Sequence, residues 1–147
     1  MKRAIELDLH LARALLMEKG ATIVVVKNGR VLYIGYDHGL RDLYMIVRNK
    51  EVSLPGSSVA DKVIGKAAAV ILLSHAVKGV YATILSKSAL ELLKRRILKL
   101  EYEKLVPAIR GRNGDLCPFE KLVLKIDDVK EAYRVLMRAL KRTFISP

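Results

Sequence analysis

Hydrophobic and polar positions change their period several times along the chain, and these changes predict alternating helices and strands. Apolar residues from Leu9 to Leu16 repeat at helical spacing. Asp8 is suited to cap this first helix, and Gly20 is typical of a helix end. A buried strand is predicted over Ala21–Lys27, because the residues from Thr22 to Val26 are mostly β-branched.

A hairpin and a short helix are predicted next. Asn28 and Gly29 form the dipeptide that most favours a tight β-turn, so Arg30–Tyr36 is expected to return antiparallel to the first strand. The apolar residues within Gly39–Arg48 have the spacing of a short helix. A loop is expected over Asn49–Ser57, which contains a Pro-Gly pair.

The centre of the chain predicts one long helix over Ser58–Val77. Ser58 followed three residues later by Asp61 resembles a capping box, and the sequence is apolar on nearly all sides after Lys66. Gly65 would then lie inside the helix, where glycine costs about 1 kcal/mol relative to alanine. Its presence suggests close packing or the approach of a ligand.

The remaining pattern completes an α/β order. It predicts strands over Val80–Leu85, Ile97–Tyr102 and Leu122–Ile126, and helices after Ser86 or Ser88, from Cys117-Pro118 and over Val129–Arg142. We therefore expect a single α/β domain over residues 1–147, with a mixed sheet of about five strands flanked by helices in three layers and a C-terminal helix at about 128–142. In such sheets ligands bind at the carboxyl ends of parallel strands, near helix starts.

The amino-acid composition indicates the cellular location of the protein and the kind of molecule that it binds. The chain is 52% hydrophobic, which excludes a disordered protein, and its longest uncharged apolar run, Ala67–Val77, is too short to span a membrane. The N-terminus shows no signal peptide, and Cys117 is the single cysteine, so a cytoplasmic location without a membrane partner is expected. The net charge of +12 favours polyanions or small anionic molecules. The lack of Gln and Trp is also typical of thermophilic proteins, which leaves the function of the charge open.

Two motifs resemble a known family. The sequence VADKVIGKAAA over residues 59–69 and the Cys-Pro-Phe-Glu block at 117–120 are similar to the motifs of a prokaryotic family catalogued as domain of unknown function 1893. The resemblance covers about residues 8–126 and implies a cytidine-deaminase-like fold. The family usually carries an Asn-Arg pair before the Cys-Pro block. Here the order is Arg110-Gly111-Arg112-Asn113, so the Asn is displaced.

The residues needed for zinc-dependent deamination are missing from this sequence. Zinc deaminases carry an H-x-E motif and a P-C-x-x-C motif. None of the three histidines, His10, His38 and His75, is followed by x-Glu, and Cys117 has no second cysteine. We therefore expect no zinc site and no cofactor, and no catalytic residue can be assigned.

The candidate ligand-binding residues are those near predicted helix starts and the two motifs: Asp61, Lys62, Lys66, Ser86, Arg112, Cys117 and Glu120. Together they would bind a small anionic ligand such as a nucleotide or metabolite. Each also has a structural interpretation. Asp61 and Ser86 could serve as helix-capping residues alone, and Lys62 and Lys66 could be solvated surface lysines. Glu120 could pair with Lys66 or Arg112.

Two other functions remain open at this point. The charge would support a basic nucleic-acid-binding module, although the aromatic residues are scattered and the expected binding is weak, non-specific and confined to low salt. The chain could instead be a non-catalytic interaction protein, such as a homodimer.

Overall fold

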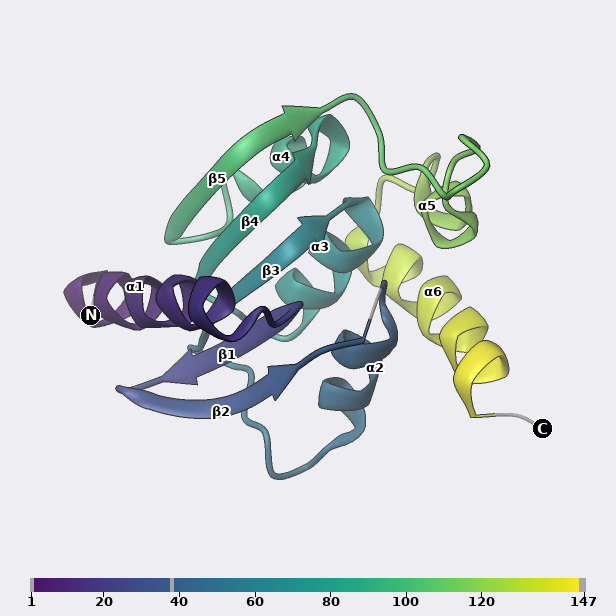
Figure 1. Ribbon diagram of the computed structural model, residues 1–147. Helices are drawn as coiled ribbons and strands as arrows, with labels where there is room; N and C mark the ends of the chain where they lie inside the picture. The colour runs from purple at the N-terminus through teal and green to yellow at the C-terminus, as the bar shows by residue number, and fades with distance from the viewer. Residues whose placement is uncertain (1, 38, 146–147) are drawn as a thin grey trace.

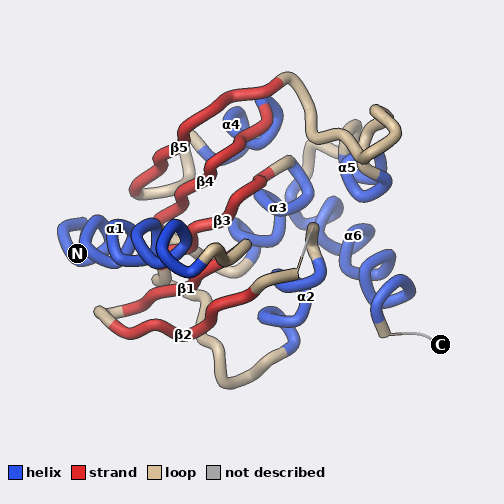
Figure 2. Tube along the Cα trace, viewed as in Figure 1, coloured by secondary structure: helices blue, strands red, loops and turns tan. Residues whose placement is uncertain are grey.

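The computed structural model describes residues 2–37 and 39–145, so His38 lies outside the described residues. Figures 1 and 2 show the arrangement of the helices and strands. In chain order they are α1 (Lys2–Lys19), β1 (Ile23–Lys27), β2 (Arg30–Gly35), α2 (Arg41–Arg48), β3 (Ser58–Ile64), α3 (Lys66–Ser74), β4 (Gly79–Ser86), α4 (Lys87–Leu93), β5 (Lys99–Val106), α5 (Pro118–Val123) and α6 (Val129–Phe144).

The strands form one mixed five-stranded sheet in the order β2-β1-β3-β4-β5. The strands β3, β4 and β5 are parallel to one another, and β1 is antiparallel to both of its neighbours. The carboxyl ends of β3, β4 and β5 therefore share one edge of the sheet. In Figure 1 their arrowheads point toward the side of the molecule where α5 and α6 lie.

Helices cover both faces of the sheet, as the sequence predicted. The long helix α1 packs through Leu9, Ala12 and Leu16 against Val24 and Tyr81 on one face. The larger core lies on the other face, where α3 is buried along most of its length and packs against α4, α5 and α6. Figure 1 shows α1 in front of the sheet and α2, α3 and α4 behind it. None of the helices in the described part of the chain is both long and apolar enough to cross a membrane.

The predicted helix over Ser58–Val77 is wrong in its first half, which is the central strand β3. This strand pairs with β1 on one side and with β4 on the other, so its first residues are buried on both faces and lack the alternation that marks a half-exposed strand. Gly65 ends the strand and is the N-cap of α3, with extended backbone angles. The helix therefore begins at Lys66, and Asp61 is a strand residue rather than part of a capping box.

The short strand predicted over Leu122–Ile126 is also wrong, because these residues finish α5 and form the turn after it. The expected number of about five strands is nevertheless confirmed, with β3 in place of the segment near the C-terminus. The strand predicted at Ile97–Tyr102 lies slightly later, at Lys99–Val106. The C-terminal helix is present and extends to Phe144.

Asp8 does not cap the first helix, which begins at Lys2. Asp8 is instead an interior residue of α1 and is only 4% exposed. Its carboxylate accepts hydrogen bonds from the backbone N–H groups of Asn28 and Gly29, both at 2.8 Å. Asn28 and Gly29 have φ values of 51° and 77°, as a tight hairpin turn requires. The predicted hairpin is therefore confirmed. Its turn is held by the carboxylate of Asp8, which belongs to the helix α1.

Candidate functional site

A cavity of about 320 Å³ lies at the sheet edge formed by the carboxyl ends of the parallel strands. Its wall combines the end of β3, the start of α3, the segment before α2, the start of α5 and the end of α6. The residues that line it are Thr22, Asp37, Gly39, Leu40, Asp61, Lys62, Val63, Gly65, Ala68, Ile109, Cys117, Phe119, Glu120 and Phe144. Segments far apart in the sequence thus converge where α/β sheets bind ligands.

Asp61 is the most perturbed acid in this wall. It pairs in the sheet with Ile23 of β1 and Ala82 of β4, so its side chain lies on the face covered by α3. Burial raises the pKa of the Asp61 carboxyl to about 7, and the negative charge of Asp42 adds to the rise. A hydrogen bond of 3.3 Å from the backbone N–H of Val63 opposes it. Near neutral pH the carboxyl therefore exists in both protonation states and can accept or donate a proton.

Asp42, whose negative charge helps to raise the pKa of Asp61, is held by several hydrogen bonds. Its carboxylate accepts hydrogen bonds from the Thr22 and Tyr33 hydroxyls, each at 3.1 Å, and from the backbone N–H of Asp37 at 2.8 Å. This network connects the start of α2 to the start of β1 and to the end of β2. Asp42 therefore supplies a fixed negative charge beside the cavity, while Asp61 remains the carboxyl available to a ligand.

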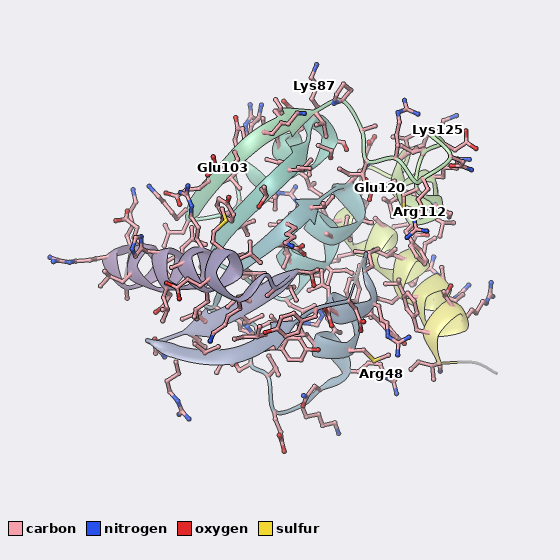
Figure 3. The ribbon with its side chains drawn as sticks, in the orientation of Figure 1. Arg48, Lys87, Glu103, Arg112, Glu120 and Lys125 are labelled. Carbon is pink, nitrogen blue, oxygen red and sulfur yellow. The ribbon has the colours of Figure 1, made fainter. Side chains whose placement is uncertain are left out.

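Glu120 joins the two sequence motifs into one structural unit. Its carboxylate is 7% exposed and accepts hydrogen bonds of 2.8 Å from the backbone N–H groups of Lys66 and Ala67, the first two residues of α3. Burial raises the pKa of Glu120, and these two hydrogen bonds and the Lys66 charge oppose the rise. Figure 3 shows Glu120 on the side of α5 that faces α3. The anion-binding end of α3 is thus already occupied by a side chain of the same protein.

The side chain of Lys66 forms a second connection between α3 and the region of α5. Its ammonium group donates hydrogen bonds to the backbone carbonyls of Leu124 at 3.2 Å and Ile126 at 3.0 Å, at the end of α5. Leu124 is the C-cap of α5 and Ile126 lies in the turn after it, so the positive charge of Lys66 holds this turn. Lys66 does not line the cavity.

The other four candidate residues differ in whether they line the cavity. Lys62 lines it and is exposed, and the half-buried Cys117 lines it from the N-cap of α5. Ser86 is fully buried, caps α4 by accepting a 3.1 Å hydrogen bond from the backbone N–H of Ala89, and does not line the cavity. Arg112 is exposed on the loop before α5, and it also does not line the cavity.

Comparison with known proteins identifies the family. The family model described as Domain of unknown function (DUF1893) matches residues 11–140. The chain belongs to the DUF1893 family. A crystal structure of a DUF1893 family protein from Thermotoga maritima is similar to it at a TM-score of 0.80 and 32% sequence identity, over 91% of this chain and 90% of that chain. No curated protein sequence matches the chain.

The DUF1893 motifs thus place four of the seven candidate residues around one cavity: Asp61, Lys62, Cys117 and Glu120. Sequence analysis missed the apolar wall and the polar residues Thr22 and Asp37. The two polar residues stand just before β1 and just after β2, at the same edge as Asp61, so the hairpin was a usable signal for them. Within residues 2–37 and 39–145, no three His, Cys, Asp or Glu side chains are arranged to hold a metal ion.

Proposed function

We propose that this DUF1893 protein is a cytidine-deaminase-like domain that binds a small nucleotide-like metabolite in the cavity at Asp61. The observation that carries the proposal is an acid with a pKa of about 7 in a mostly apolar cavity at the ligand-binding edge of an α/β sheet. The five-stranded mixed sheet between helices agrees with that fold.

The wall of the cavity favours a planar organic body. Phe119 and Phe144, whose rings lie 6.2 Å apart, form one part of it, and Leu40 and Ile109 add further apolar surface. Asp61 is the polar group that would orient such a body, because its carboxyl can accept a hydrogen bond when ionised and donate one when protonated. A heterocycle with a hydrogen-bonding edge meets both requirements.

The positions of the charged groups support an anionic part of the ligand at the rim of the cavity. The start of α3, which would otherwise attract a phosphate, is occupied by the Glu120 carboxylate. Lys62 is the exposed cation in the cavity wall. We therefore expect a phosphate or carboxylate of the ligand to contact Lys62, with the uncharged body inside.

A cavity-filling variant tests this proposal. Val63 lines the cavity and is 41% exposed, so Val63→Trp should fold and obstruct the site, while Val31→Trp at a 43% exposed position on β2 is a matched control. Ligand-observed NMR with a panel of nucleosides and nucleotides should detect binding to the natural protein and to Val31→Trp. Binding should fall at least tenfold in Val63→Trp and in Asp61→Asn. No binding by any panel member at millimolar concentration, or equal binding by the two tryptophan variants, would overturn the proposal.

The proposal includes a zinc-free site, since the residues around Asp61 that the structure describes do not form a zinc-binding set. Metal analysis of protein purified without chelators should find far less than one zinc per chain. One tightly bound zinc per chain would contradict the expected chemistry of the cavity.

A further inference from the structure

A second hollow region lies at the opposite end of α3, about 13 Å away along a helix of nine residues. Its larger part is a cavity of about 800 Å³ between the end of α3, the turn before β5 and the start of α6. A smaller hollow of about 280 Å³ adjoins it, because Lys78 and Arg96 line both. The region lies at the amino ends of β4 and β5, so it is separate from the cavity at Asp61.

The polar side chains of the smaller hollow are all cationic. They are Lys78, Arg95 and Arg96, and the other lining residues are Ile97 and Leu98. In the part of the chain that the structure describes, no carboxylate forms an ion pair with any of these three cations. Three like charges around one concave surface repel one another, and a bound anion would relieve that repulsion.

The larger cavity has a different character. Asp127 and Asp128 lie in its wall, and Tyr133 meets His75 through a 2.7 Å hydrogen bond between the phenolic oxygen and Nε2. Leu73 adds apolar surface. These groups suit an organic body that carries hydroxyl or amino donors, because carboxylates accept hydrogen bonds from them.

We propose that this region binds a small phosphorylated metabolite. Its phosphate lies among Lys78, Arg95 and Arg96, and its hydroxyl-bearing body extends into the cavity beside Tyr133. The two aspartates favour a small phosphomonoester over a nucleic acid, since further phosphates of an extended strand would lie against Asp127 and Asp128. The inference does not depend on the function proposed for the cavity at Asp61.

A titration with ribose 5-phosphate, followed by amide NMR shifts, tests this inference. The shifts should be confined to residues 73–78, 95–98 and 127–133. Arg95→Gln should weaken binding at least tenfold, because it removes one of the three cations around the phosphate. Arg142→Gln, at an exposed position in the last turn of α6, removes the same charge elsewhere and should leave the affinity within twofold.

The contrary outcomes are distinct. Equal losses in Arg95→Gln and Arg142→Gln would show a long-range charge effect without a site, and scattered or absent shifts would overturn the site directly. Tighter binding of a twelve-nucleotide oligothymidine than of ribose 5-phosphate, with the same dependence on Arg95, would replace the metabolite by a nucleic acid. Val63→Trp should not change ribose 5-phosphate shifts in this region, so the inference and the proposed function can fail separately.

Discussion

Gly65 lies against the carboxylate of Glu120 so closely that any side chain at its position would force the carboxylate to move. A Cβ atom built on Gly65 would lie 2.6 Å from the carboxyl carbon of Glu120. That approach lets the carboxylate reach the backbone N–H groups of Lys66 and Ala67. Gly65 of the first motif and Glu120 of the second motif are therefore in direct contact. Both residues line the cavity at Asp61.

Gly65→Ala should destabilise the protein by about 2–3 kcal/mol. The added methyl group must displace a buried carboxylate and weaken its two hydrogen bonds, and overpacking of this kind costs about 1–3 kcal/mol. Urea unfolding of the variant and the natural protein measures the difference. Gly111→Ala is the control, because the nearest side-chain atom lies 3.6 Å from its Cβ position. A loss below 0.5 kcal/mol for Gly65→Ala would contradict the tight contact.

Lys66→Met should loosen α5 and the turn that follows it. The ammonium group donates to the carbonyls of Leu124 and Ile126, and removal of these charge-assisted bonds should cost about 1–3 kcal/mol. Hydrogen–deuterium exchange should rise in residues 118–126. Lys62→Met, which removes the same charge from an exposed position on the cavity wall, should leave that exchange unchanged. Equal exchange in the two variants would mean that Lys66 is only a solvated lysine.

Local patterns predicted the outer parts of the fold well. The hairpin at Asn28-Gly29, the helix start at Cys117-Pro118 and the C-terminal helix all depend on neighbouring residues, and each is present. The central strand β3 was interpreted as helix because its burial comes from two strands that lie elsewhere in the sequence. A strand buried on both faces does not alternate between apolar and polar residues, and Gly65 was the one local signal of its end.

The candidate site was predictable only in part, for a related reason. Asp61 and Glu120 stand in motifs and could be selected as residues. The backbone partners of Glu120 and the apolar wall beside Asp61, however, come from distant segments. The charge of Lys66 binds carbonyl groups of a turn that was predicted to be a strand. The error in secondary structure thus hid the hydrogen-bond partners of this lysine.

Asp8→Ala should destabilise the hairpin more than the helix that carries it. The variant loses the two 2.8 Å hydrogen bonds to Asn28 and Gly29, which should cost about 2 kcal/mol. Amide exchange should rise at residues 23–35, while α1 should be little changed, because alanine favours helix. Glu18→Ala, at an exposed position on the same helix, is the control. Unchanged exchange in the hairpin would show that the turn forms without the Asp8 carboxylate.

Asp61 should make the stability of the protein depend on pH in the neutral range. Its pKa rises from 3.8 to about 7 on folding. Between these values the folded protein retains a proton that the unfolded chain releases, so the free energy of unfolding should fall as the pH rises from about 4 to about 7. Asp61→Asn, which cannot ionise, should lack this decrease and be more stable than the natural protein at pH 8, with a smaller difference at pH 4.5. Urea unfolding of Asp61→Asn and of the natural protein at several pH values measures this difference. A difference between Asp61→Asn and the natural protein that stays constant with pH would show that the carboxyl is not held in an environment that favours its neutral form.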